Sequence, residues 1–182
     1  MSKIAVVYWS GTGNTEAMAQ QVEAGAKAAG AEVSVYTCAD FQADMMDQFD
    51  AVAFGCPSMG NEQLEEDEFE PMFQSCESRL SGKKIALFGS YGWGDGEWME
   101  SWEAQCRQDG AVLACDSVIC NETPDDEAQE ACRNLMGRYS YYRTAFQSKE
   151  MVALWAKRDD DKLVTPWGSY QGHQGIEACY LK

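Results

Sequence analysis

Short apolar segments alternate with segments of helical periodicity along most of this 182-residue chain. The apolar segments are rich in β-branched and aromatic residues, which predicts buried strands. They span residues 3–9, 31–37, 50–56, 83–89 and 111–120, the last broken near Asp116. Helical spacing follows Thr15 as far as Gly30 and recurs over 65–79, 97–109, 125–146 and, more weakly, 41–48. This alternation predicts an α/β fold, with a parallel sheet covered by helices on both faces.

Three of the predicted strands end in loops rich in glycine and polar residues. The loops read SGTGNTE, GCPSMGNE and GSYGWGDGE, and they follow the first, third and fourth strands. Because the carboxyl ends of parallel strands meet at one edge of a sheet, the three loops are expected to converge there. The sequence therefore predicts a ligand site at this edge.

The first loop, within YWSGTGNTE (8–16), precedes a predicted helix, whose N-terminal N–H groups favour an anion. Neutral donors surround it, and no Lys is present to contact the outer phosphates of a nucleoside triphosphate. It also lacks the third glycine of the dinucleotide-binding pattern. A single phosphate fits these donors best, and the alternative is an ordinary turn that caps a helix. The donors are Ser10, Thr12, Asn14 and Thr15.

The other two loops offer flat or soft side chains separated by glycines. Met59, Tyr91 and Trp93 are typical covers for a planar ring, and Glu62 is placed to accept a hydrogen bond from a ring N–H. Each of these residues alone is more typical of core packing than of ligand binding. Together with a loop for one phosphate, they point to flavin mononucleotide (FMN).

Three stretches carry a family resemblance: YWSGTGNTE (8–16), GCPSMGNEQLEEDEFEP (55–71) and LFGSYGWGDGEWM (87–99). With them, the chain resembles the short-chain flavodoxins over about residues 1–138. The resemblance implies a flavodoxin-like, doubly wound, five-stranded parallel sheet of order 2-1-3-4-5. It also implies one noncovalent FMN and one-electron transfer to protein partners at low potential.

The resemblance further implies which residues contact the cofactor. The phosphate would be held by Ser10, Thr12, Gly13, Asn14 and Thr15. Met59 would cover one face of the ring and Trp93 the other, and Glu62 would meet the ring N3–H. The surrounding loop positions would be Pro57, Ser58, Gly60, Asn61, Ser90, Tyr91, Gly92, Gly96 and Asn121.

The net charge of −16 argues against binding to nucleic acid or to an anionic membrane surface. We expect a cytoplasmic protein, because no signal-peptide or membrane-span pattern is present and the eight Cys read as reduced thiols. Six acidic residues fall within residues 62–70, a solvated face that also suits docking of basic redox proteins. The predicted docking residues are Glu62, Glu65, Glu66, Asp67 and Glu68.

The first 138 residues contain no His, which argues against Ser–His or Cys–His nucleophilic catalysis in that region. The lone His173 is typical of a surface residue. We therefore expect an electron carrier rather than an enzyme, with no metal site. Two alternatives stay open at this point: an FMN-dependent NAD(P)H quinone or small-molecule reductase, and a binding module that signals redox state.

Residues 139–182 differ from the preceding part of the chain in charge. They carry 6 Lys and Arg against 5 Asp and Glu, whereas residues 1–138 carry 8 against 25. The segment resembles the start of a SnoaL-like, NTF2-related domain, through NLMGRYSYYRTAF and LWAKRDDDKLVTPWGSYQGHQGI. We expect a C-terminal extension of helices and a short strand ending at Pro166, either idle or docked on the first domain or on a second copy as a homodimer.

Overall fold

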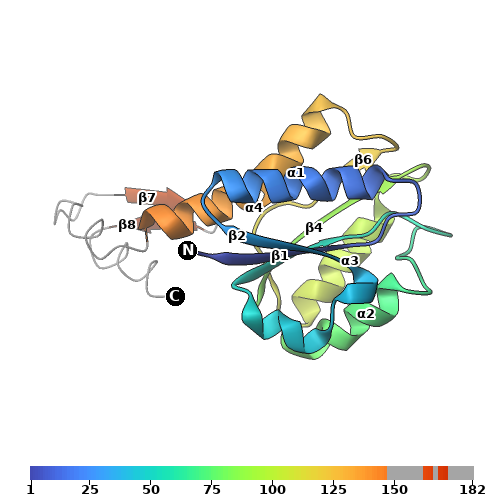
Figure 1. Cartoon of the computed structure of the whole chain (residues 1–182), viewed down its shortest axis with the longest axis horizontal. Coiled ribbons are helices and arrows are strands. Elements are labelled where there is room, and N and C mark those ends of the chain that lie inside the picture. Colours follow the sequence, from blue (N-terminus) through green and yellow to red (C-terminus); the bar gives the residue numbers. More distant parts are fainter. Residues whose placement is uncertain (147–161, 166–167, 172–182) are drawn as a thin grey trace.

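The structure is a computed structural model that describes residues 1–146, 162–165 and 168–171 (Figure 1). Its centre is a parallel sheet of order β2-β1-β3-β4-β5, in which β6 also pairs with β4. The predicted α/β class and the strand order 2-1-3-4-5 are therefore confirmed. The strands are β1 (Lys3–Tyr8), β2 (Glu32–Thr37), β3 (Ala51–Gly55), β4 (Lys84–Tyr91), β5 (Val112–Leu113) and β6 (Val118–Asn121).

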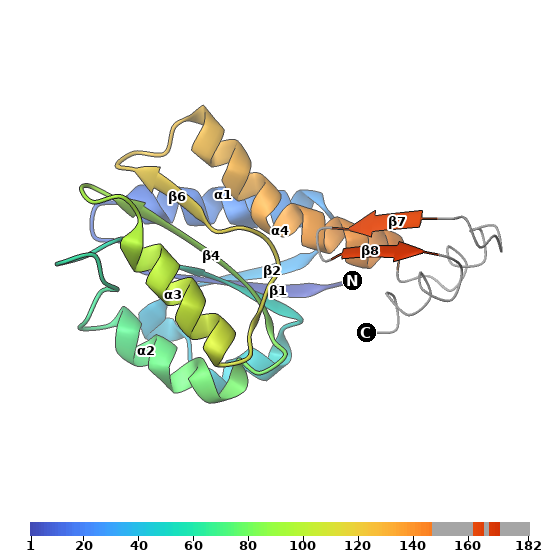
Figure 2. The ribbon, with the colours of Figure 1, turned by 180° about the vertical axis from the view of Figure 1, so that it is seen from behind.

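Helices cover both faces of this sheet, as the alternating pattern predicts. Figures 1 and 2 show α1 (Asn14–Ala28) and α4 (Asp126–Phe146) on one face, and α2 (Phe69–Cys76) and α3 (Glu97–Gln108) on the other. Short 3-10 helices complete the second face: η1 (Cys38–Asp40), η2 (Ala43–Gln48) and η3 (Glu77–Arg79). The weak helical pattern over 41–48 thus corresponds to one short 3-10 segment.

The two faces of the sheet are packed with side chains of different size. The face under α2 and α3 buries aromatic rings, among them Phe54, Phe73 and Trp102. The face under α1 and α4 buries mainly small and flexible residues, such as Ala53 and Met18. Small side chains let α1 lie close to the sheet, and this fixes the N-terminus of α1 beside the end of β1.

A close crossing also fixes α1 against α4. A Cβ atom on Gly25 would lie 1.9 Å from the carbonyl oxygen of Arg133, and one on Gly137 would lie 3.3 Å from the carbonyl oxygen of Gly25. Real Cβ atoms are not found at the first of these distances, so the crossing requires glycine at position 25. The helix that begins at the first glycine-rich loop is therefore held in place from both sides.

Two predicted boundaries differ from the observed ones. The helix expected over 65–79 begins only at Phe69, because the Glu65 carboxylate accepts hydrogen bonds from the N–H groups of Asp67, Glu68 and Phe69 at 2.8–3.0 Å. Residues 65–68 therefore form a capping turn rather than the first helical turn. The strand expected over 111–120 is broken near Asp116 as predicted, into β5 and β6.

The helix expected at 125–146 is observed as α4 and continues past residue 138 without a break. Beyond it, β7 (Lys162–Thr165) and β8 (Gly168–Gln171) form an antiparallel pair. β7 confirms the short strand predicted before Pro166, whereas β8 was not predicted. The other predicted elements of the extension, and His173, lie outside the described residues.

No helix among the described residues is long and apolar enough to cross a membrane. Within the same part of the chain, no group of three or more His, Cys, Asp or Glu side chains is placed to hold a metal ion. Seven cysteines are described, and all of them are free thiols. Burial raises the pKa of Cys38 and Cys120 to about 11, and of Cys106 and Cys132 to about 12. These four thiols are therefore protonated at neutral pH.

Candidate functional site

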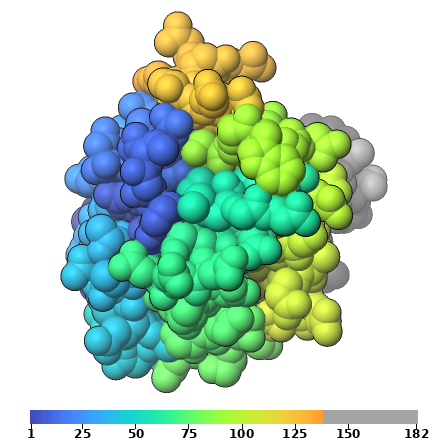
Figure 3. All heavy atoms as spheres, turned by 90° about the vertical axis from the view of Figure 1, so that its right-hand side faces the viewer, coloured from blue at the N-terminus to red at the C-terminus, as the bar shows by residue number. Residues whose placement is uncertain are grey.

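The three glycine-rich loops meet at the carboxyl edge of the sheet, as predicted. Figure 3 looks onto this end of the molecule, where loops from β1, β3 and β4 and the β6–α4 connection come together. A cavity of about 370 Å³ lies between them. Its lining residues are Trp9, Gly11, Thr12, Asn14, Pro57, Ser58, Met59, Ser90, Tyr91, Gly92, Glu122 and Thr123. This volume lies within the range typical of small-molecule sites.

Eight of the predicted site residues line this cavity: Thr12, Asn14, Pro57, Ser58, Met59, Ser90, Tyr91 and Gly92. The other predicted positions lie on the same loops but outside the lining. They are Ser10, Gly13, Thr15, Gly60, Asn61, Glu62, Trp93, Gly96 and Asn121. The loops therefore lie together as predicted, and the assignment of these residues to a cofactor stays a prediction.

The first loop forms a tight turn that ends in α1. The N–H group of Gly13 donates to Ser10 Oγ at 3.1 Å, and Gly13 itself adopts a left-handed conformation with φ of 90°. A residue with a Cβ would be strained there, so glycine is required by the turn. Ser10 therefore shapes the loop from within.

The side chain of Thr15 is buried and is already paired. Its hydroxyl lies 3.1 Å from that of Ser90, and the two share a hydrogen bond that ties the first loop to β4. Thr15 is 1% exposed and Ser90 is 5% exposed. The hydroxyl of Thr15 is thus engaged in support of the loop.

The N-terminus of α1 differs from those of the other α-helices in the part of the chain that the structure describes. Carboxylates reach the first backbone N–H groups of the other three: Glu65 at α2, Glu62 at α3 and Asp125 at α4. The capping residue of α1 is Gly13, which has no side chain to bind these N–H groups. The first N–H groups of α1 are therefore open to an external anion beside the cavity.

The donors around this helix end are neutral. None of the twelve lining residues is Lys or Arg, and Glu122 is the one carboxylate among them. The polar side chains of the lining include those of Thr12, Asn14 and Thr123. The Asn14 and Thr123 side chains are 3.4 Å apart and link the first loop to the β6–α4 connection. One phosphate, bound by backbone N–H groups and hydroxyls, fits this donor set, as the sequence predicts.

The second loop is a short hairpin with constrained ends. Backbone hydrogen bonds join Met59 and Gln63 in both directions, at 2.8 and 3.0 Å. Within it, Gly60 and Glu62 both have φ of 52°. A positive φ is uncommon for a residue such as Glu62 and marks a backbone held in place by its surroundings. Met59, at the start of the hairpin, is 38% exposed at the cavity.

Glu62 connects the second loop to the third. Its Oε1 accepts hydrogen bonds from the N–H groups of Gly96 and Glu97, both at 3.0 Å, where α3 begins. This carboxylate therefore caps α3 and holds the two loops at a fixed separation. Its predicted hydrogen bond to a ring N–H stays a prediction.

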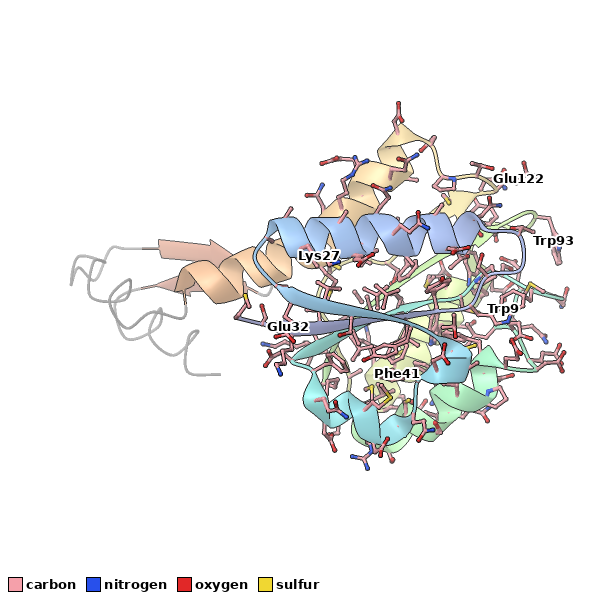
Figure 4. The ribbon with its side chains drawn as sticks, in the orientation of Figure 1. Trp9, Lys27, Glu32, Phe41, Trp93 and Glu122 are labelled. Atoms are coloured by element: carbon pink, nitrogen blue, oxygen red, sulfur yellow. The ribbon has the colours of Figure 1, made fainter. Side chains whose placement is uncertain are left out.

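The third loop carries Tyr91 and Trp93 in different settings. Tyr91 lines the cavity and packs on Trp98, with ring centroids 5.6 Å apart. Trp93 is 58% exposed, and Figure 4 shows its side chain at the same end of the molecule as Trp9 and Glu122. An exposed indole beside a cavity of this kind is available to stack on a flat ligand.

Sequence reasoning missed Trp9, Gly11, Glu122 and Thr123 as lining residues. The last two lie next to the predicted Asn121, whose Nδ2 donates to the carbonyl oxygen of Tyr91 at 3.2 Å. Glu122 has φ of 55°, and its N–H donates to the same carbonyl at 2.8 Å. The signal for Glu122 and Thr123 was their place after the broken fifth strand, at the same edge as the other loops.

The predicted docking residues are not equally accessible. Glu65 is only 6% exposed, because its carboxylate turns inward to cap α2. Its inclusion in a docking surface was therefore wrong. Glu66, Asp67 and Glu68 are exposed, and Glu62 is partly buried against α3.

Comparisons with known proteins agree with this fold. The family model described as "Flavodoxin" matches residues 6–135. A flavodoxin of Megasphaera elsdenii is 46% identical over 132 residues, which cover 72% of this chain and 94% of that protein. One from Clostridium beijerinckii is 44% identical over 127 residues, covering 70% and 91%. The solution structure of two-electron reduced M. elsdenii flavodoxin matches with a TM-score of 0.66, covering 72% of this chain and 98% of that one.

Proposed function

The chain belongs to the flavodoxin family, and we propose that it holds FMN with the phosphate at the N-terminus of α1 and the ring between the loops after β3 and β4. It is an FMN-dependent electron-transfer protein and not an enzyme, as its flavodoxin relatives are. The bound FMN supplies the one-electron chemistry, and the side chains of this protein bind it, orient it and set its surroundings. The relatives do not favour the alternative of an NAD(P)H-dependent reductase.

The uncapped N-terminus of α1 is the observation that carries this proposal. Anions at a helix N-terminus are stabilised by free N–H groups and by the helix dipole, without any Lys or Arg. The proposed phosphate contacts are the backbone N–H groups that begin α1, with the side chains of Ser10, Thr12 and Asn14 around them. Thr15 supports the loop through Ser90.

The ring would lie between the loops that carry Met59 and Trp93. Both side chains are exposed in part, so a flat ligand placed between them would bury apolar surface on each of its faces. Tyr91 and Gly92 border the same space. Gly60, Asn61 and Glu62 would face the edge of the ring, and Asn121 would support it through the Tyr91 carbonyl.

A comparison of FMN with riboflavin tests the proposed orientation. The two ligands share the ring and differ in the phosphate, so their dissociation constants for the cofactor-free protein isolate the contribution of the α1 N-terminus. We expect FMN to bind at least about 100-fold more tightly than riboflavin, because several charge-assisted hydrogen bonds are made only by the phosphate. Equal affinities would place the phosphate elsewhere.

Redox partners are proposed to dock beside the ring, on the exposed acids Glu66 and Asp67, with Glu62 and Glu68 at the margin of the surface. The strongly negative net charge favours association with proteins that carry basic patches. The same charge disfavours adding a second electron to the flavin, which supports a low potential for the second reduction step.

The rate of electron transfer to cytochrome c, a basic haem protein, tests this surface. Glu66→Gln should slow the second-order rate about twofold at low ionic strength, and the difference should vanish at high salt. Glu32→Gln is the matched control, since Glu32 lies at the opposite end of the molecule from Trp9 and Trp93 (Figure 4). Equal effects of the two substitutions would show that only net charge matters.

Two further proposals concern the chain as a whole. We propose a cytoplasmic location, which its free thiols support in the described residues. Residues 139–182 are proposed to be a C-terminal extension of the flavodoxin domain of residues 1–138, joined to it through α4. Its resemblance to the start of a SnoaL-like domain and its role in a homodimer stay predictions.

A further inference from the structure

One acidic residue near the cavity makes a contact that neither docking nor helix capping explains. The carboxylate Oε2 of Glu68 accepts a hydrogen bond of 2.8 Å from the indole Nε1 of Trp9. The two residues are 59 positions apart in the sequence. Glu68 lies in the turn before α2, whereas Trp9 directly follows β1 and lines the cavity.

The ring of Trp9 also lies against the first glycine-rich loop. A Cβ atom on Gly11 would be 2.8 Å from Cη2 and 3.2 Å from Cζ3 of Trp9. The backbone of the loop thus approaches the indole more closely than any other residue type would allow. The position of this ring and the path of the loop are therefore coupled.

Trp9 is only partly buried: its side chain packs against the aromatic core on one side and lines the cavity on the other. Its backbone N–H donates to the carbonyl oxygen of Gly55 at 3.0 Å, so the backbone of Trp9 is held by β3. The orientation of the side chain depends on the contacts of the ring. The hydrogen bond from the indole N–H to Glu68 is the one directional contact of that ring among the described residues. Glu68 is therefore placed to hold the indole in one orientation.

We propose that Glu68 is a positioning residue for cofactor binding, which acts by anchoring Trp9 as a wall of the phosphate side of the cavity. This inference rests on the proposed binding of FMN with its phosphate at α1. It divides the acidic segment of residues 62–70 by role: Glu68 serves the cofactor through Trp9, and Glu66 and Asp67 serve the partner. The useful property of Glu68 is its acceptor oxygen, whereas its negative charge is incidental.

Substitutions at position 68 separate the acceptor from the charge. Glu68→Ala removes both, and we expect it to weaken FMN binding to the cofactor-free protein by up to about tenfold, the value of one ordinary hydrogen bond. Glu68→Gln keeps an acceptor oxygen and removes the charge, so its dissociation constant should stay within about twofold of the original. Glu66→Ala, at an exposed acid of the same segment, is the matched control and should also change little.

A double-mutant cycle tests whether Glu68 acts through Trp9. Trp9→Phe keeps a ring and loses the N–H donor, so adding Glu68→Ala to it should weaken FMN binding no further. The indole N–H resonance of Trp9, assigned by its loss in Trp9→Phe, should shift in the cofactor-free Glu68→Ala protein and stay in place in Glu66→Ala. Thermal unfolding of each cofactor-free variant verifies that it is folded.

Several results would overturn the proposal. They are equal affinities for FMN in Glu68→Ala and Glu66→Ala, equal losses in Glu68→Gln and Glu68→Ala, or additive effects of Trp9→Phe and Glu68→Ala. Failure of the original protein to bind FMN, or to prefer it to riboflavin, would instead contradict the proposed function. The two failures are therefore distinguishable.

Discussion

The two ends of the cavity are built in different ways. At the phosphate end, the loop of residues 10–15 is closed by internal hydrogen bonds, and its Thr15 and Ser90 hydroxyls are buried and paired. At the ring end, the loops of residues 59–62 and 91–96 carry Met59 and Trp93 in exposed positions. Their backbones also have positive φ values at four residues: Gly60, Glu62, Gly94 and Gly96.

This difference suggests a division of labour. A preformed phosphate end contributes affinity at little cost in ordering, because its donors are already in place. An exposed ring end leaves the reactive part of the cofactor open to other proteins, as electron transfer between proteins requires. We therefore expect substitutions at the phosphate end to affect retention of FMN, and substitutions at the ring end to affect the flavin itself.

The largest effect is expected where both ends share a support. Gly89 lies in β4 beneath the cavity, and a Cβ atom there would be 2.1 Å from the carbonyl oxygen of Cys56. Gly89→Ala should therefore push β3 and β4 apart and lower the free energy of unfolding by about 3 kcal/mol or more. Denaturant unfolding of the cofactor-free protein measures this loss.

Gly92→Ala provides the matched control. No heavy atom lies within 4 Å of a Cβ at Gly92, and its φ is not in the left-handed range. Its stability should change by less than about 1 kcal/mol. If Gly89→Ala were equally mild, the close approach of β4 to the end of β3 beneath the cavity would not be the common support of the two ends.

At the phosphate end, Thr15→Val should disturb the buried hydroxyl pair. The substitution leaves Ser90 Oγ without its partner, which costs about 1–3 kcal/mol in the free energy of unfolding. Because the loop that holds the phosphate is loosened, FMN should lose more affinity than riboflavin. Thr15→Ser, which keeps the hydroxyl, should restore most of the preference, and an equal loss for both ligands would remove the distinction between the two ends.

At the ring end, Trp93→Ala should weaken FMN and riboflavin alike. Removal of a stacking indole costs about 1–2 kcal/mol, a value comparable to base stacking on aromatic side chains. The cofactor-free protein should keep its stability, since Trp93 is 58% exposed. Titration by quenching of flavin fluorescence measures both affinities, and a loss confined to FMN would contradict the assignment of Trp93 to the ring.

The smallest predicted effect concerns pH and the turn behind the ring end. Burial of the Glu65 carboxyl raises its pKa, but three backbone N–H donors outweigh burial and hold the pKa below its usual value of 4.5. Ionised Glu65 therefore stabilises the fold above about pH 4.5, and this contribution is lost as the pH falls through the lower pKa of the folded state. Glu65→Gln should be less stable than the original protein at pH 7, by about 1 kcal/mol.

Unfolding measured across pH 3–7 examines this expectation. The gap in stability between the original protein and Glu65→Gln should narrow below about pH 4, as the carboxylate of the folded protein becomes protonated. Glu66→Gln, at an exposed neighbour, should show little change at any pH. A gap that stayed constant with pH would mean that the charge of Glu65 is not what caps α2.

Features that depend on local pattern could be predicted from the sequence. The alternation of apolar strands and helical segments gave the sheet and its two helical layers, and the glycine-rich loops located the edge that carries the cavity. These signals are local because burial imposes periods of 2 or 3.6 residues on the sequence. The break near Asp116 was predictable on the same grounds.

The contacts that individual acidic side chains make, most of them with distant residues, were not predictable from pattern. The inward turn of Glu65, the Glu62 cap on α3 and the Trp9–Glu68 hydrogen bond all lie in one acidic segment that reads as a uniform solvated face. A run of like charges gives no sign of which carboxylate meets a helix end 34 residues away. The cavity wall at Glu122 likewise depends on how β6 and α4 are joined.

An anaerobic reductive titration of the FMN-loaded chain, followed by visible absorbance, tests the central claim most directly. An electron carrier should take up its two electrons in separate steps, so a long-wavelength absorbance band should first rise and then fall as reductant is added. The second step should occur at the lower potential. Conversion directly to the two-electron reduced form, with no long-wavelength band at any point, would contradict the account of this protein as a one-electron carrier.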